Sequence, residues 1–330
     1  MKALILKAIE ELELKKDVPK PTPSKNEVLI RVRYCGICGS DLEAYNYGKV
    51  LTPIILGHEF SGEIEEIGSK VVGWKIGDRV TAYPGEFCRE CYFCKKGEEN
   101  RCIRTMIGLG ITVNGALAEY VKISSKSLCK LPDSVSYENG ALVEPLAVGY
   151  HGVKISGIHS TDIAVVIGAG TIGLSTIQAL KLSNIENIYV IEPSEYNLNL
   201  ALQMGVQKAA RPSKINKIGP KFVFDCAGFP KTYKDAIRIV QRGGTVVLLG
   251  VHFENVPISF LELIVKEVNL KGSFGYSFEE FKEIIALLSQ KKIQTNLILS
   301  KKVKLENVID EGFHELLRPD RKAAKILVEI

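Results

Sequence analysis

The chain has 330 residues, of which 46% are hydrophobic and 25% are charged. This length accommodates about two domains with sizeable cores, and the composition is that of an ordinary soluble globular protein. The net charge is only +5, and the lysines are scattered among glutamates without a basic block. We therefore expect a solvated surface and no nucleic-acid partner.

Two segments argue against a membrane location. The apolar run at residues 1–6 is too short for a signal peptide. The most apolar window, residues 163–180, contains three glycines and three hydroxyl-bearing residues, which suit a strand and a helix joined by a turn. The sequence therefore predicts a cytoplasmic protein with no membrane partner.

The first part of the chain, residues 1–145, carries short β-rich runs such as Val28–Tyr34 and Arg79–Tyr83, interrupted by proline, glycine and cysteine. This texture predicts an irregular β-rich domain.

Metal-type ligands are spread along this part. Cys38 lies in Gly-Ile-Cys-Gly-Ser-Asp, His58 and Glu59 follow Gly57, and Glu144 precedes Pro145. One thiolate, one imidazole and carboxylates suit a Zn²⁺ site that is less rich in sulfur than a structural site and keeps a position for water or substrate. The residues alone do not assemble this site, because a histidine beside a glutamate is more often a structural or surface pair.

A second set of ligands is much more specific. Four of the eight cysteines fall within fifteen residues, with the spacing Cys-x2-Cys-x2-Cys-x7-Cys. Four thiolates from one tight lobe match the closed tetrahedral site of structural Zn²⁺. An iron–sulfur run would place its last cysteine three residues on and follow it with proline, whereas seven residues intervene here. In a reducing compartment these cysteines are expected to hold metal and not disulfides. The four are Cys88, Cys91, Cys94 and Cys102.

From about residue 146 the pattern alternates between strand-like and helix-like segments, which predicts a doubly wound parallel sheet. Farther on, Ser277 and Glu280 form a capping box that opens a helix. Its apolar residues recur at helical spacing and are expected to pack in a core. The expected strands are Ile163–Ile167, Ile188–Ile191, Phe222–Phe224, Thr245–Leu249 and Val268–Leu270; the expected core residues of the helix are Phe278, Phe281, Ile284, Ile285 and Leu288.

The run Gly168-Ala-Gly170-Thr171-Ile172-Gly173 lies directly between the first of these strands and a helical stretch, Leu174–Leu182. In that place the first glycine makes the turn, the second admits a pyrophosphate close to the backbone, and the third permits tight helix packing. The sequence therefore predicts a dinucleotide site, with a merely structural glycine turn as the alternative.

Glu192 ends the next strand, nineteen residues after Gly173. A carboxylate there accepts hydrogen bonds from the ribose hydroxyls and repels a 2′-phosphate. No Lys or Arg occurs from Pro193 to Gln207. NAD is therefore favoured over NADP.

The Gly-Ile-Cys-Gly-Ser-Asp segment, the Gly-His-Glu, the four-cysteine lobe and the glycine-rich loop resemble, in that order, the zinc-dependent medium-chain alcohol dehydrogenases. The resemblance spans most of the chain. It implies an α/β protein with a GroES-like catalytic domain (1–145 and 276–330, zinc lobe at about 85–104) and a Rossmann domain (146–275). The active site would lie between the domains. We also expect a homo-oligomer, a dimer or a tetramer.

The resemblance also implies roles for single residues. Cys38, His58 and Glu144 are similar to the catalytic zinc ligands, with Glu59 as an alternating or water-linked ligand, so that two zinc ions are expected per subunit. The run from Glu144 to Leu146 resembles the sorbitol and sugar dehydrogenases, in which the third ligand is a glutamate. Three cysteines have no such match and are interpreted as ordinary buried residues: Cys35, Cys129 and Cys226.

In such an enzyme zinc lowers the pKa of a bound alcohol, and hydride passes to the nicotinamide. Ser40 would accept the alcohol proton, and Asp41 would orient His58; both could instead be helix caps. Many relatives carry a histidine five residues after the first zinc cysteine, where this chain has Glu43. The group that would carry the proton to solvent is therefore not identified. Glu43 is a candidate acceptor for a hydrogen bond from a substrate hydroxyl.

The leading hypothesis is an NAD-dependent zinc oxidoreductase acting on a secondary alcohol, a polyol or a sugar. Close alternatives are an L-threonine, 2,3-butanediol or simple alcohol dehydrogenase. A non-enzymatic zinc and nucleotide sensor is a remote alternative. A zinc-free quinone reductase is disfavoured because such an enzyme would not need the candidate zinc ligands that this chain carries.

Overall fold

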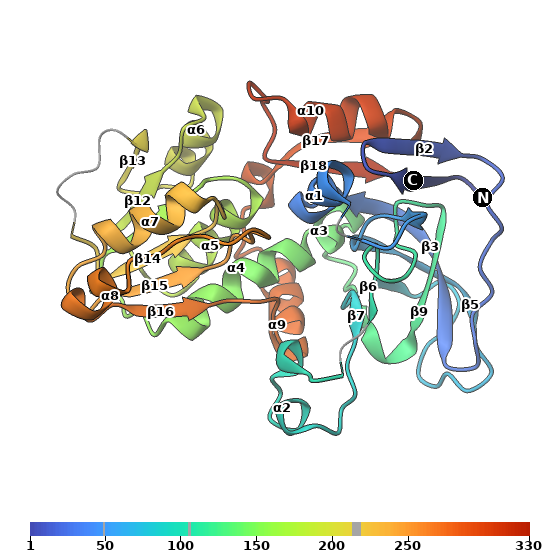
Figure 1. Ribbon diagram of the computed structural model, residues 1–330. Coiled ribbons are helices and arrows are strands. Elements are labelled where there is room, and N and C mark those ends of the chain that lie inside the picture. The colour runs from blue at the N-terminus through green and yellow to red at the C-terminus, as the bar shows by residue number, and fades with distance from the viewer. Residues whose placement is uncertain (49, 105–106, 213–218) are drawn as a thin grey trace. The chain divides into compact units, whose positions relative to one another are not determined.

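The computed structural model describes residues 1–48, 50–104, 107–212 and 219–330 (Figure 1). The chain divides into two compact units. Unit 1 comprises Met1–Glu144, Ser277–Lys291 and Leu299–Ile330, and unit 2 comprises Pro145–Tyr276 and Lys292–Ile298. No helix in the described part of the chain is long and apolar enough to cross a bilayer.

Unit 1 is built mainly on β-sheets. A seven-stranded sheet has the order β10-β6-β5-β3-β18-β17, with β9 also paired to β3, and a three-stranded sheet has the order β2-β1-β4. The strands are β1 (Ala3–Ala8), β2 (Glu11–Lys15), β3 (Glu27–Gly36), β4 (Ile54–Ile55), β5 (Glu59–Ile67), β6 (Arg79–Ala82), β7 (Gly85–Glu86), β8 (Ile107–Gly108), β9 (Tyr120–Ser124), β10 (Leu128–Lys130), β17 (Leu299–Lys304) and β18 (Lys325–Glu329).

The helices of unit 1 are short, apart from α9, whose predicted capping box is present between Ser277 and Glu280. Four of the five core residues predicted for α9 lie at helical spacing in its interior and are fully or almost fully buried; all four face the core as the pattern required. The helices are α1 (Gly39–Tyr47), α2 (Tyr92–Lys95), α3 (Tyr137–Ala141), α9 (Phe278–Ser289) and α10 (Glu315–Leu317), with 3₁₀ turns η1 (Glu99–Arg101), η2 (Ser125–Ser127) and η5 (Leu305–Asn307) and a π-helical segment η6 (Val308–His314).

The central strand of unit 1 is β3. It pairs antiparallel with β5 on one side and with β18 on the other. The register sets Gly36 opposite Glu59 of β5 and opposite Leu327 of β18. Strand β5 precedes unit 2 in the sequence, and β18 follows it. Their pairing with β3 brings residues 59 and 325–327 to the same end of that strand.

Unit 2 contains a six-stranded sheet of order β13-β12-β11-β14-β15-β16 among the described residues, and every pairing in it is parallel. The four inner strands, β12, β11, β14 and β15, are short and strongly apolar, as expected for parallel strands covered on both faces. The strands of the sheet are β11 (Ala164–Ile167), β12 (Ile188–Ile191), β13 (Lys208–Ala210), β14 (Phe222–Asp225), β15 (Thr245–Leu248) and β16 (Asn269–Gly272); the helices are α4 (Val143–Ser156), α5 (Thr171–Leu182), α6 (Glu195–Gln203), α7 (Pro230–Ile239) and α8 (Phe260–Lys266), with a 3₁₀ turn η4 (Thr295–Leu297).

The structure differs from the sequence-based expectation in strand bounds, for example β16 at Asn269–Gly272 instead of Val268–Leu270, and in two further places. Helix α5 begins at Thr171, so the last glycine of the loop lies inside the helix and not before it. The segment Lys292–Ile298 belongs to unit 2, although it lies within the part expected to complete the first domain. Ile293 and Ile298 are buried, and the Gln178 side chain donates a hydrogen bond to the Gln294 carbonyl at 3.2 Å.

Candidate active site

The buried carboxylate of Asp41 connects the two loops that carry Cys38 and His58, two of the candidate zinc ligands. Cys38 is the N-cap residue of α1, and Asp41 is the third residue of that helix. The Asp41 side chain accepts hydrogen bonds from the backbone N–H of Cys38 at 2.8 Å and of Gly57 at 3.2 Å. With only 1% of Asp41 exposed, these bonds compensate a charge that would otherwise be costly to bury.

Gly57 is required by the local backbone. Its φ is +94°, and a Cβ there would come within 2.7 Å of the Cys35 sulfur and 2.9 Å of the Leu117 nitrogen. Only glycine adopts this conformation without strain. The turn delivers His58 and then Glu59, where β5 begins.

Cys38, His58 and Glu59 converge. Their ligand atoms all lie within 4.8 Å of one another. His58 and Glu59 are buried and Cys38 is half-buried. A thiol, an imidazole and a carboxylate gathered in this way are a donor set that Zn²⁺ accepts, and it contains one sulfur and not four.

The electrostatics of this cluster favour a cation. Burial alone would lower the pKa of His58, but the negative charges of Cys38, Asp41 and Glu144 outweigh it and raise that pKa well above its usual value. The His58 Nδ1 atom is buried and has no hydrogen-bond partner among the described residues.

Asp41 also lies beside His58, the residue that it is expected to orient. The distance from His58 Nδ1 to Asp41 Oδ1 is 3.9 Å, which is beyond hydrogen-bond range. The carboxylate is instead engaged by backbone N–H groups, so Asp41 positions His58 indirectly, by holding the Gly57 turn.

Glu144 lies near the start of α4 and is half-buried. Its charge acts on His58 and on Tyr83, whose pKa is raised first by burial and then by Glu144. In the described part of the chain, the close group of ligand atoms contains Glu59 and not Glu144. Ser40 and Glu43 both lie on α1, next to Cys38, and both are half-buried.

Lys325, the first residue of β18, was not anticipated from the sequence. It is 1% exposed, and its Nζ atom lies 2.6 and 2.7 Å from the two oxygens of Glu59. Burial lowers the pKa of Lys325, but the neighbouring charges of Glu59 and Cys38 outweigh this and raise it. The only signal in the sequence is a lysine at the head of the apolar run Ile326–Val328, and such a lysine is normally exposed.

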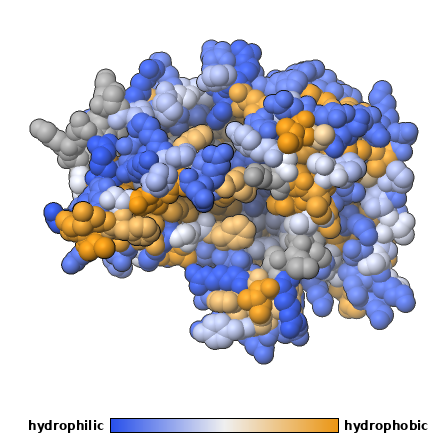
Figure 2. Space-filling model, viewed as in Figure 1, coloured by the Kyte–Doolittle hydropathy of each residue, from blue (hydrophilic) through white to orange (hydrophobic). Residues whose placement is uncertain are grey.

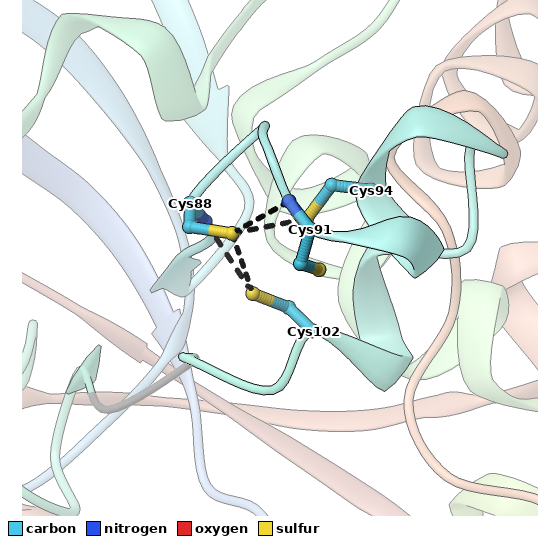
Figure 3. Close-up of side chains that lie close together, drawn as sticks. All are labelled: Cys88, Cys91, Cys94 and Cys102. Atoms are coloured by element: carbon cyan, nitrogen blue, oxygen red, sulfur yellow. Dashed lines mark hydrogen bonds between the residues drawn. The ribbon is translucent and has the colours of Figure 1, made fainter.

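The four cysteines of the lobe lie close together, with their sulfur atoms within 4.8 Å of one another (Figure 3). The Cys88 sulfur lies 3.5 Å from that of Cys102 and 3.9 Å from that of Cys94. Backbone N–H groups donate to the sulfurs, for example Cys91 N to Cys88 at 3.3 Å, which suits thiolate ligands. All four are free cysteines.

This lobe is also tied to α9. The Glu99 carboxylate accepts a hydrogen bond at 3.1 Å from the backbone N–H of Phe278, the first residue of that helix. The Phe278 ring packs against Tyr83 and Phe87, with ring centroids 6.2 and 5.8 Å apart. The lobe therefore anchors a helix that is far away in the sequence.

In unit 2 the three loop glycines have distinct structural roles. Gly168 has a φ of +89° and makes the turn. A Cβ on Gly173 would lie 1.9 Å from the Gly168 carbonyl oxygen, so this residue permits close packing. A Cβ on Gly170 would meet nothing within 4 Å; the space beside the N-terminus of α5 is open, as an approaching phosphate requires. Thr171 and Ile172 form the first turn of α5.

Glu192 follows β12 and is 6% exposed. Its two oxygens accept hydrogen bonds from the backbone N–H of Ala169 at 2.6 Å and of Ser194 at 2.8 Å. The carboxylate is thus fixed beside the glycine-rich loop.

The three remaining cysteines are chemically quiet. Burial raises the pKa of Cys129 to about 12 and that of Cys226 to about 12, and it raises the pKa of Cys35 well above the usual value. These thiols stay protonated at neutral pH. Cys35 and Cys129 are buried as expected, whereas Cys226 is half-buried.

Comparisons with known proteins agree with this architecture. Residues 24–133 match the family of the alcohol dehydrogenase GroES-like domain, and residues 171–290 match the zinc-binding dehydrogenase family. The chain is 33% identical to (R,R)-butanediol dehydrogenase of Bacillus subtilis over 94% of each protein. It belongs to the zinc-dependent medium-chain alcohol dehydrogenases.

Further relatives place this dehydrogenase in the polyol branch of the family. It is 31% identical to the sorbitol dehydrogenase of Bacillus subtilis, over 99% of this chain and 97% of that protein. The crystal structure of 2R,3R-butanediol dehydrogenase from Bacillus subtilis superimposes with a TM-score of 0.90 at 31% identity, covering 100% of this chain and 99% of that one. The predicted GroES-like and Rossmann folds and the predicted class, a zinc-dependent alcohol oxidoreductase, are confirmed.

We predict two zinc ions per subunit that differ in exchangeability, because one donor set is closed by four sulfurs and the other is mixed. Gentle chelation is expected to remove one zinc together with activity, while the second zinc and the fold persist. Metal analysis and circular dichroism on the same sample measure this. A fully active protein with a single zinc would contradict the prediction.

Proposed function

We propose that this dehydrogenase oxidises a secondary alcohol of a polyol or vicinal diol, with NAD as the hydride acceptor. The observation that carries the proposal is the convergence of Cys38, His58 and Glu59 beside α1. Cys38, His58 and Glu144 would hold the catalytic zinc, with Glu59 close by, and the four-cysteine lobe would hold the structural zinc.

When bound, zinc supplies a Lewis acid that lowers the pKa of an alcohol. The chain's own residues do the rest. Ser40 would take up the alcohol proton and pass its own hydroxyl proton on toward the ribose hydroxyls of the cofactor. Glu43, on the same helix, would accept a hydrogen bond from a neighbouring substrate hydroxyl. A carboxylate is a good acceptor for such a group, which supports substrates with adjacent hydroxyls over simple alcohols.

Both relatives named above act, by their names, on compounds with adjacent hydroxyl groups, butanediol and sorbitol. A panel of sorbitol, xylitol, 2,3-butanediol, threonine and a simple secondary alcohol separates the alternatives. We expect the highest kcat/KM for a polyol or 2,3-butanediol. A preference for the simple alcohol would overturn the substrate proposal.

Replacing Cys38 with alanine is expected to abolish turnover of every substrate in this panel while NAD binding is largely retained, because the ligand belongs to unit 1 and the glycine-rich loop to unit 2. Cys129→Ala is a matched control, since that thiol is buried away from any ligand group. Kinetics and fluorescence titration with NADH measure the two effects. Near-normal turnover in Cys38→Ala would show that the catalytic zinc is misplaced.

The cofactor proposal rests on Glu192. Its carboxylate is fixed by two backbone N–H groups, so it cannot easily turn away from a ribose. A 2′-phosphate would bring about two negative charges against it. Arg211 is a candidate for a phosphate donor, but its guanidinium already lies 3.5 Å from the Glu195 carboxylate.

We predict that the parent enzyme strongly prefers NAD. Replacing Glu192 with alanine and the exposed Pro193 with arginine removes the repulsion and adds a donor, so the ratio of kcat/KM for NADP to that for NAD is expected to rise by about tenfold or more. Glu195→Ala frees Arg211 without touching Glu192 and serves as the control. A parent that already prefers NADP would refute the assignment.

We further propose that the homo-oligomer contains a dimer formed by two copies of unit 2. Strand β16 is the last strand of the sheet among the described residues, and all four of its residues are exposed. Helix α8 beside it exposes Phe260, Leu261 and Ile264 by 70% or more, and Figure 2 shows the apolar patch. An open edge strand can pair with its own copy about a two-fold axis, and the apolar helix would cover the same contact.

Ile264→Asp is expected to shift the protein toward monomer, because it places a charge in the patch that a second copy would bury. Leu202→Asp, at a solvent-exposed position of α6, is the control and should leave the oligomer unchanged. Light scattering coupled to size exclusion measures both. Unchanged mass in Ile264→Asp would rule out this interface.

A further inference from the structure

Four buried side-chain atoms of unit 2 have no hydrogen-bond partner among the described residues, and they share one place in the fold. They are Asn197 Oδ1, Asp225 Oδ2, His252 Nε2 and Ser273 Oγ. Each belongs to a segment at the carboxyl end of a parallel strand, because α6 follows β12, Asp225 ends β14, and the other two follow β15 and β16. Buried polar groups without partners are rare. Their grouping at this edge of a parallel sheet indicates a ligand site.

Close contacts join the glycine-rich loop to the loops that follow β14 and β15. A Cβ on Gly168 would lie 3.0 Å from the Cβ of Ala227, and a Cβ on Gly250 would lie 2.2 Å from the nitrogen of Gly228. The Tyr233 hydroxyl donates a hydrogen bond to the Gly250 carbonyl at 2.7 Å. The loop after β15 is therefore fixed on the same edge as the proposed pyrophosphate site.

His252 and Ser273 extend this edge beyond β14. The Ser273 N–H donates to the Leu248 carbonyl of β15 at 2.9 Å, so the end of β16 is aligned with that of β15. Both side chains are half-buried, whereas the apolar residues that follow them, Phe253 and Phe274, are 52% and 76% exposed. Polar atoms buried beside exposed aromatic residues reverse the usual arrangement. Apolar walls with a few fixed polar groups are typical of a small-molecule site.

The strand order indicates which half of a dinucleotide this site would hold. The glycine-rich loop follows β11, and Glu192 follows β12 on one side of it, where the adenosine ribose is expected. Strands β14, β15 and β16 lie on the other side of β11, which leaves them the nicotinamide half. The nicotinamide ring carries one polar group, a carboxamide with a carbonyl acceptor and two N–H donors. A neutral imidazole and a hydroxyl can each complement such a group.

We propose that His252 and Ser273 bind the carboxamide of the nicotinamide ring, His252 through Nε2 and Ser273 through Oγ. The inference deepens the proposed function and rests on its nicotinamide cofactor. Because the carboxamide is the only polar group on the ring, two hydrogen bonds to it would fix which face of the ring is presented to the alcohol.

The test measures binding to the zinc-loaded, full-length enzyme without an alcohol. NADH is titrated by fluorescence, and ADP-ribose, which lacks the nicotinamide, by calorimetry. In His252→Ala and in Ser273→Ala the Kd for NADH is expected to rise by about tenfold, while the Kd for ADP-ribose stays parental. His159→Ala and Ser160→Ala, at exposed positions before β11, are the matched controls. Parental NADH affinity in either site variant, or an equal loss of both ligands, would overturn the proposal.

A cofactor analogue identifies the group that is bound. The reduced 3-acetylpyridine analogue of NADH carries a methyl group in place of the carboxamide NH₂. The parent is expected to bind it more weakly than NADH, because a partner of the NH₂ group is left unpaired. In His252→Ala/Ser273→Ala the ratio of the two Kd values should fall to about one. An unchanged ratio in this double variant would contradict the assignment.

A stability measurement separates this binding role from a structural one. Ser273→Ala removes a hydroxyl that has no hydrogen-bond partner among the described residues, so the Tm without NADH is expected to stay parental or to rise. The increase in Tm that NADH causes should become smaller. A lower Tm without NADH, together with a full NADH-induced increase, would make the residue structural and refute the proposal.

Failure of the proposed function is distinguishable from failure of this inference. A parent that binds neither NADH nor NADPH would refute the proposed cofactor itself. A parent that prefers NADPH would correct the assignment of Glu192 and leave this test intact with NADPH as the probe, because the two cofactors share the same nicotinamide end.

Discussion

The candidate active site depends on the buried carboxylate of Asp41. It binds the backbone at Cys38 and at Gly57, and so it fixes the spacing between the thiol and the imidazole before any metal is bound. A buried carboxylate is tolerated only when its oxygens are satisfied. The same two bonds that satisfy Asp41 therefore hold the ligands together, so the stability of this residue and the geometry of the site cannot be separated.

The two groups of metal-type ligands are built by different means. In the lobe, local sequence is sufficient, because four thiols within fifteen residues can meet around one ion whatever the rest of the fold does. The other cluster draws on an N-cap, a glycine turn and the start of a strand, and it needs the complete sheet of unit 1. The first arrangement suits a permanent ion, and the second suits one whose surroundings can be adjusted.

This difference also explains what the sequence could predict. The parallel sheet, the glycine-rich loop and the lobe are encoded by contiguous patterns, and they appear in the structure close to their expected positions. The two backbone N–H groups that donate to Asp41 were not predicted, because the sequence does not show which backbone groups face a side chain. The contact of Glu59 with Lys325 depends on strand register between segments more than 260 residues apart, and no contiguous pattern in the sequence shows it.

The position of β18 has a consequence for the order of folding. This strand, formed by residues 325–329, lies between β3 and β17 inside the large sheet of unit 1. Unit 2 is formed almost entirely by the continuous stretch Pro145–Tyr276. During synthesis, unit 2 can therefore close its core while unit 1 still lacks an interior strand. The β-rich unit 1 therefore depends on a strand that follows unit 2 in the chain, and its ligand cluster acquires Lys325 only when that strand has been added.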